Sequence, residues 1–141
     1  MNELTDAIHD RLSADATLAA LLNTYGGAPA VFTIDPVPGD AELPYIVTAG
    51  EAVDAAFDTK TCIGRHIWRD VRCYAAADGS AIVVEQIAER VRELLHRLPL
   101  TVTGWCVFMA ECGGPVVADE QDAYGRVVTV RMKMLEQDSG S

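Results

Sequence analysis

The side chains best suited to metal binding or nucleophilic chemistry are four cysteines and three histidines, which are scattered along the 141-residue chain. The pairs Cys62/Cys73 and Cys106/Cys112 lack the CxxC spacing of a zinc site, although His66 follows Cys62 by four residues and leaves one weak candidate. We therefore predict no metal and no cofactor. The cysteines are expected to be small apolar residues on strands.

Motifs of known catalytic chemistry are also missing from the sequence. No GxSxG, Walker A or GxGxxG pattern occurs. His9 and His96 lie among charged residues of predicted helix surfaces, where solvated side chains are expected. The acidic run at 119–122 lacks the spacing and the closing Glu of an EF-hand, so it is predicted to be a solvated connection. The sequence therefore favours a protein that is not an enzyme.

One strand-like run, 62–74, mixes arginines and aromatic residues on both of its faces. Arginine and aromatic side chains are favoured at protein interfaces, so Arg65, Trp68, Arg69 and Arg72 are candidates for an oligomer interface. Two alternatives stay open. The arginines pair with acids of their own subunit, or the run binds nucleic acid, which a net charge of −10 disfavours.

The charge is distributed unevenly along the chain. Residues 1–59 contain ten acids and one base, whereas residues 60–110 contain seven bases and five acids. This asymmetry indicates either a solvated acidic face or a head-to-tail association of unlike surfaces. The composition, which is 50% hydrophobic and 23% charged, excludes disordered and fibrous classes. No apolar run reaches membrane-span length and no basic leader precedes one, so neither a membrane span nor a signal peptide is expected.

Hydrophobic periodicity predicts the element order α-α-β-β-β-α-β-β. Leu4, Ile8 and Leu12 predict a first helix, and a cap at 13–15 starts a second one. A long helix is predicted over 80–98, capped by 78–80 and stopped by Pro99. Its predicted core stripe is Val83, Ile87, Val91, Leu94, Leu95 and Leu98.

Five strands are predicted, at 31–34, 43–48, 62–74, 100–112 and 126–136, with a loop at 51–61. The last strand alternates most clearly, which places Val128, Val130, Met132 and Met134 in the core and turns Thr129, Arg131 and Lys133 outward. The expected fold is α+β, a mainly antiparallel sheet of about five strands with the N-terminal helices and the long helix packed on one face. A single domain over 1–136 and a disordered tail over 137–141 are expected.

Three stretches together resemble a known family: 12–21 (LSADATLAAL), Val31-Phe32, and Leu43-Pro44-Tyr45-Ile46-Val47 after a turn rich in Pro and Gly. They are similar to the opening of the tail terminators, the small tail-completion proteins of long-tailed bacteriophages and of phage-derived gene transfer particles. The later segments follow the same order, so the resemblance extends over nearly the whole chain.

The resemblance implies a non-enzymatic virion protein. Subunits of such families form a six-membered ring that caps the tail tube, ends its polymerisation and joins it to the head and neck, while DNA passes through the lumen. The implied partners are therefore further copies of the chain, the tail tube protein and a head or neck connector, with assembly in the host cytoplasm and no membrane. Two other functions remain open: a neck or head-completion connector, and a small cytosolic enzyme or ligand-binding domain with an unrecognised site.

Overall fold

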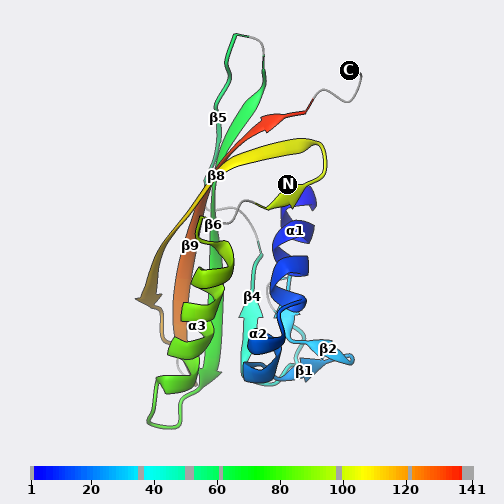
Figure 1. The fold of residues 1–141 in the computed structure, drawn as a ribbon. Helices are drawn as coiled ribbons and strands as arrows, with labels where there is room; N and C mark the ends of the chain where they lie inside the picture. Colours follow the sequence, from blue (N-terminus) through cyan, green and yellow to red (C-terminus); the bar gives the residue numbers. More distant parts are fainter. Residues whose placement is uncertain are drawn as a thin grey trace.

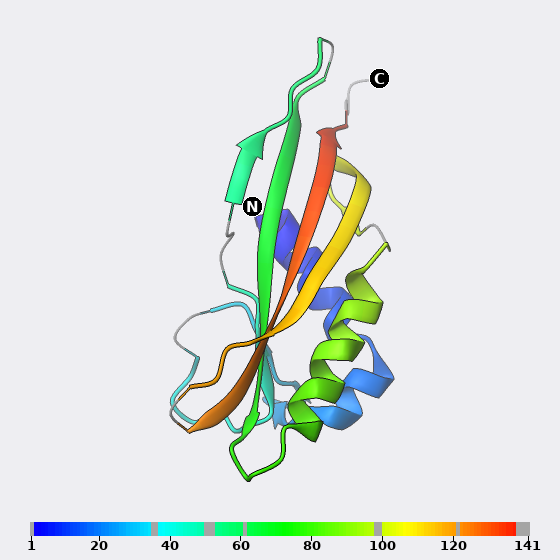
Figure 2. The ribbon, with the colours of Figure 1, turned by 90° about the vertical axis from the view of Figure 1, so that its left-hand side faces the viewer.

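A long twisted sheet with helices beside it forms the framework of the protein (Figures 1 and 2). The computed structural model describes residues 2–34, 37–49, 53–60, 62–97, 100–120 and 122–137. Within these residues the helices are α1 (Asn2–Ser13), α2 (Ala16–Leu21) and α3 (Ile82–Leu95). The strands are β1 (Thr24–Tyr25), β2 (Ala28–Pro29), β3 (Val31–Phe32), β4 (Tyr45–Val47), β5 (Val53–Ala56), β6 (Gly64–Ala76), β7 (Thr101–Val102), β8 (Trp105–Val117) and β9 (Ala123–Glu136).

The central part of the sheet consists of the three longest strands, in the order β6-β9-β8. β4 and then β3 extend it beyond β6, β7 pairs with the start of β8, and β5 pairs with the other half of β6. All of these pairs are antiparallel except β3 with β4. β1 and β2 form a separate two-stranded hairpin. The α+β class and the mainly antiparallel sheet are therefore confirmed.

The core lies between the helices and the inward-facing side chains of β6, β8 and β9. In Figure 2 the strands run in front of α1, while α3 lies beside β8. The predicted inward residues of β9, Val128 to Met134 at alternate positions, are all 0% exposed, and so are Leu4, Ile8 and Leu12 of α1. The two periodicities, two for the strand and about four for the helix, thus place their apolar side chains in one cluster.

The free edge of β8 is covered by the end of α3. The Cys112 backbone N–H donates to His96 Nδ1 at 3.0 Å, and the Arg97 N–H donates to the Ala110 carbonyl at 2.8 Å. An Arg92 guanidinium N–H also donates to the Gly114 carbonyl. Because an open strand edge exposes unpaired backbone groups, these contacts block pairing with another strand. His96, predicted to be solvated, therefore has a structural contact instead.

Several predicted boundaries of the strands were wrong. The described sheet has seven strands rather than five, because part of the predicted loop at 51–61 forms β5 and β7 precedes β8. β8 also continues through Gly113-Gly114-Pro115 to Val117, where the register with β9 shifts between Gly113 and Val116. This irregularity accommodates the turn-forming residues that indicated a strand end.

The long helix is shorter than predicted, and its buried stripe begins at a different residue. α3 starts at Ile82 rather than Ser80, and its N-cap, Ala81, makes no side-chain capping bond. Val84 is 0% exposed, whereas Val83, predicted to be buried, is 39% exposed. Ile87 and Val91 are buried as predicted. The predicted stripe residue Leu98, the stop at Pro99 and residues 138–141 of the predicted tail lie outside the described residues.

The predicted cap of the second helix is confirmed at Asp15. Its carboxylate accepts the Leu18 backbone N–H at 2.8 Å, and it also pairs with Arg90 of α3 at 2.7 and 2.9 Å. The hydrogen bonds from Arg90, followed by the one from Leu18, hold the pKa of Asp15 below its ordinary value of 3.8 against the opposing effect of burial. Asp15 thus joins α2 to α3.

Asp15→Ala is expected to lower the free energy of unfolding at pH 7 by about 1–2 kcal/mol, because it removes an N-cap and the pairing to α3. A depressed folded-state pKa stabilises the protein above the unfolded-state pKa and loses that effect as the pH falls through the folded-state pKa. The difference between wild type and Asp15→Ala should therefore shrink below pH 3.8. Chemical denaturation at pH 7 and at about pH 2 measures it. An equal loss of unfolding free energy at both pH values would contradict the role of the Asp15 charge. Glu89→Ala, on the exposed surface of α3, is the control.

Candidate interaction surface

The four predicted interface residues all lie on β6, but they point to opposite faces of the sheet. Ile67 and Val71, at odd positions, are 0% exposed and face the helices, so Arg65 and Arg69 lie on this inner face. Trp68 and Arg72 lie on the opposite face, which we call the outer face. The structure therefore divides the four between the two faces, and only Trp68 and Arg72 lie on the outer face.

Arg69 is a buried structural residue. Its side chain is 1% exposed, and its guanidinium donates to the Thr48 carbonyl at 2.9 and 3.2 Å and to Thr5 Oγ1 at 2.6 Å. These contacts connect β6 to α1 and to the residue that follows β4. Arg69 is therefore withdrawn from the predicted oligomer interface, because a buried and hydrogen-bonded side chain is not available to a partner.

Arg65 pairs with an acid of its own subunit, as one of the sequence alternatives expected. Its guanidinium makes a two-point contact with the Asp54 carboxylate of β5, with Nε to Oδ1 at 3.0 Å. It also lies 5.8 Å from the ring centroid of Trp105. Arg65 thus secures the β5–β6 hairpin, and half of the predicted set has an internal role.

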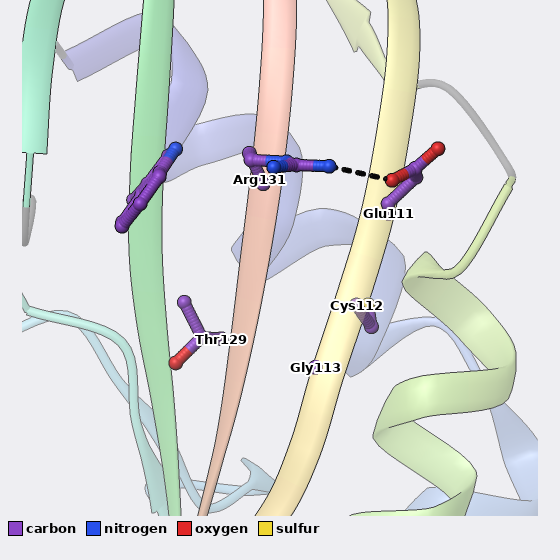
Figure 3. A pocket seen from close by; sticks show the side chains of 6 residues that line it. Glu111, Cys112, Gly113, Thr129 and Arg131 are labelled. Carbon is purple, nitrogen blue, oxygen red and sulfur yellow. Dashed lines mark hydrogen bonds and ion pairs between the residues drawn. The ribbon is translucent and has the colours of Figure 1, made fainter.

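The outer face contains a shallow trough over the middle of the sheet. Trp68 on β6, Thr129 and Arg131 on β9 and Glu111 on β8 line it, in a hollow of about 270 Å³. Figure 3 shows Arg131 extended across the sheet toward Glu111, with Gly113 lower on the same strand. A side chain at Gly113 would meet nothing within 4 Å, so the floor of the trough is open.

The electrostatics of the outer face are positive in an otherwise acidic protein. Arg72, Arg131 and Lys133 project from it, against the carboxylates of Asp70 and Glu111. Glu111 pairs with Arg131 at 2.8 Å, and Asp70 accepts the Thr129 hydroxyl at 2.7 Å. Arg72 and Lys133 form no ion pair with a carboxylate of the described residues.

His66 lies on the outer face beside these cations, opposite Lys133 in the strand register. Burial, followed by the nearby charges of Lys133 and Arg131, lowers the pKa of His66. The Trp68 indole N–H donates to His66 Nε2 at 2.9 Å, a bond that needs the unprotonated nitrogen. The neutral imidazole thus fixes the ring of Trp68, which is 39% exposed at the edge of the trough.

An aromatic cluster extends the outer face toward the β5–β6 hairpin. The rings of Phe57 and Phe108 have centroids 6.0 Å apart, and Lys133 Nζ lies 5.0 Å from the Phe57 ring centroid. The backbone of Phe57 approaches Gly64 so closely that a Cβ there would come within 2.1 Å of its carbonyl oxygen. Phe57 and Phe108 are 36% and 49% exposed, so the cluster continues an accessible surface.

The sequence missed most of this surface. It predicted that Thr129, Arg131 and Lys133 face outward, and they do, but it did not place them beside Trp68. The register Trp68↔Arg131 and His66↔Lys133 creates that proximity. Phe57 and Phe108 gave no periodic signal, because they lie in a loop and at a register shift.

The other residues considered for chemistry are the cysteines and the acidic run at 119–122. Cys73 and Cys112 are buried on strands as expected, and burial raises the pKa of the Cys73 thiol to about 12, but Cys106 is exposed and Cys62 lies outside the strands. Asp119, in the predicted solvated connection, accepts a hydrogen bond from the Arg126 guanidinium at 3.1 Å, and Arg126 also pairs with Glu85 of α3.

Across the described residues no group of three or more His, Cys, Asp or Glu side chains is placed to bind a metal ion. Nor is any described helix long and apolar enough to cross a membrane.

Comparisons with known proteins give two findings. The family model described as "Tail completion protein gp17" matches residues 6–135. A chain of the solved structure titled "Virion of native gene transfer agent (GTA) particle" has a similar fold, with a TM-score of 0.73 and 23% sequence identity over 95% of each chain. No curated protein matches the sequence.

Proposed function

Because the chain belongs to the tail completion protein gp17 family, and is thus a structural protein of the phage virion, we propose that it acts as a tail terminator. In this role it forms a ring at the head-proximal end of the tail, caps the tube and stops its polymerisation. The family match over residues 6–135 is the observation that carries the proposal, because it extends from the first helix to the last strand.

The ring is proposed to contain six copies of the chain. A ring of identical subunits needs two different surfaces on each subunit, which meet head to tail. We propose as these two surfaces the outer face, with its exposed arginines and aromatic residues, and the solvent side of α1, with the exposed acids Glu3, Asp6 and Asp10. We further propose that residues 1–136 act as one domain, which is supported by the single cluster that joins α1, α3 and the long strands.

The proposed partners follow from this position in the virion. The tail tube protein lies on one side of the ring, a head or neck connector lies on the other, and DNA passes through the opening. A net charge of −10 suits this passage, because an acidic lumen repels the phosphate backbone and does not retain it. The protein is proposed to act without catalysis and without a cofactor, first in the host cytoplasm during assembly and then in the particle.

Deletion of the gene from its parent virus tests the role in vivo. We expect heads without joined tails and a loss of DNA-delivering particles, because uncapped tails offer no surface to the neck. Wild-type protein supplied from a plasmid should restore the particles, whereas a variant that cannot fold should not. Normal particle production by the deletion strain would contradict the proposal.

A further inference from the structure

The outer face has the composition of a protein-binding surface. Its accessible side chains include Trp68, Phe57 and Phe108, beside the cations Arg72 and Lys133. Aromatic and arginine side chains supply much of the binding energy at protein interfaces. The trough between Trp68 and the Arg131–Glu111 pair adds a concave centre to this surface. A partner for it needs to be acidic and to present a convex element.

Helix α1 of the same chain has this chemistry on its solvent side. Glu3, Asp6 and Asp10 are exposed and lie on successive turns of one helix face, which we call the acidic stripe. Neither Glu3 nor Asp6 forms an ion pair within the described residues. Asp6 and Asp10 are four residues apart, a spacing at which like charges destabilise a helix. Cations of a partner would relieve this repulsion.

The two surfaces lie on opposite sides of one molecule. The outer face looks away from the helices, and the view onto the trough shows the helical segments behind the sheet (Figure 3). The inner side of α1, with Leu4, Ile8 and Leu12, is buried in the core, so its acidic stripe points away from the sheet. The outer face therefore cannot reach the acidic stripe of its own chain.

We propose that the acidic stripe of α1 in one copy docks on the outer face of the next copy. The proposal rests on the ring of the proposed function and identifies the surfaces that close it. A second copy fits better than duplex DNA, because the exposed side chains of Phe57, Trp68 and Phe108 offer apolar contacts to a protein partner, whereas a duplex is held chiefly by cations on its phosphates. A contact between copies also fits the opposite placement of the two surfaces, since a head-to-tail contact repeated around a ring uses both surfaces of every subunit.

Charge reversal on each side, alone and combined, tests the contact. The outer-face variant is Arg72→Glu with Lys133→Glu, and the stripe variant is Asp6→Lys with Asp10→Lys. In the deletion strain, each is expected to lower the titre of DNA-delivering particles by about tenfold or more, because like charges then meet across the interface. The combined variant reverses both sides and should return to within about threefold of wild type, because the attraction is restored.

Controls separate this contact from folding and from the terminator role. Each variant should keep the wild-type circular dichroism and a melting temperature within a few degrees, because the changed side chains are not in the core. Glu89→Lys on exposed α3 surface should keep the wild-type titre. If wild-type protein complements the deletion but the combined variant is no better than the weaker reversal, the proposed contact is wrong and the terminator role stands.

The assembly itself gives a second readout, by negative-stain microscopy of tail ends. The proposal predicts that rings are absent with either reversal and return with the combined variant. Six-fold rings formed by the outer-face variant that fail to stay on the tube would overturn the proposal and assign the outer face to the tube protein. A deletion that leaves particles normal would instead overturn the proposed function.

Discussion

Val91→Asp is expected to unfold the protein. Val91 is 0% exposed and lies in the cluster that joins α3 to β6, β8 and β9. A carboxylate at this position would be removed from water without a partner, at a cost of about 3–5 kcal/mol. Domains are typically stable by only about 5–15 kcal/mol, so this cost removes the whole stability of a domain at the low end of that range.

Val83→Asp is the matched control, because it places the same change on the same helix. Val83 is 39% exposed and close to the N-terminus of α3, where an acidic residue is favoured by the helix dipole. We expect Val83→Asp to change the free energy of unfolding by less than about 1 kcal/mol. Urea denaturation followed by circular dichroism measures both variants. Equal stability of the two would contradict the packing of α3.

Arg69→Glu is the second change with a large expected effect. The guanidinium of Arg69 donates to the Thr48 carbonyl and to Thr5 Oγ1 in a site that is closed to solvent. A carboxylate there would face the Thr48 carbonyl oxygen, which cannot donate a hydrogen bond to it, and a broken buried charge contact costs about 3–5 kcal/mol. We expect the variant to be unfolded or insoluble.

Two further variants identify the cause of that loss. Arg72→Glu, three positions further along β6 and on the outer face, should stay folded. Its free energy of unfolding should change by less than about 0.5 kcal/mol, since the Arg72 side chain is exposed. Arg69→Met keeps much of the apolar volume but leaves the Thr48 carbonyl without the guanidinium donor. We therefore expect the free energy of unfolding to fall by an intermediate amount, about 1–3 kcal/mol. Thermal melts of the three proteins give the ranking. A folded Arg69→Glu protein as stable as Arg72→Glu would refute the buried role.

The elements with strong periodicity could be predicted from the sequence. The four-residue spacing in α1 and the alternation in β9 each place apolar side chains on one side, and burial in the structure follows both patterns. β5 could not be predicted in the same way, because all four of its residues are exposed and, within the described part of the chain, it pairs with β6 alone. The predicted strand at 100–112 ends before β8 does, because Gly-Gly-Pro indicates a turn. Only the pairing with β9 accommodates these three residues within a strand.

The candidate surface could be predicted only in part. The mixture of arginine and aromatic residues on β6 indicates Trp68 and Arg72, which the structure places exposed on the outer face, and their part in an oligomer interface stays a prediction. The apolar residues Ile67, Val71 and Cys73 share the odd positions with Arg69, and this shared parity was the signal that Arg69 faces the core. Arg131 and Lys133 are about sixty residues away in the chain, so their place beside Trp68 depends on strand register, which the sequence alone does not determine.

The length of tails assembled without this protein tests the terminator role most directly. Tails from the deletion strain, measured by electron microscopy, are compared with those from the same strain carrying the wild-type gene on a plasmid. A terminator that stops tube polymerisation predicts a broad distribution with tails beyond the normal length, which narrows to one length when the protein is supplied. Tails of normal, uniform length in the deletion strain would contradict the role.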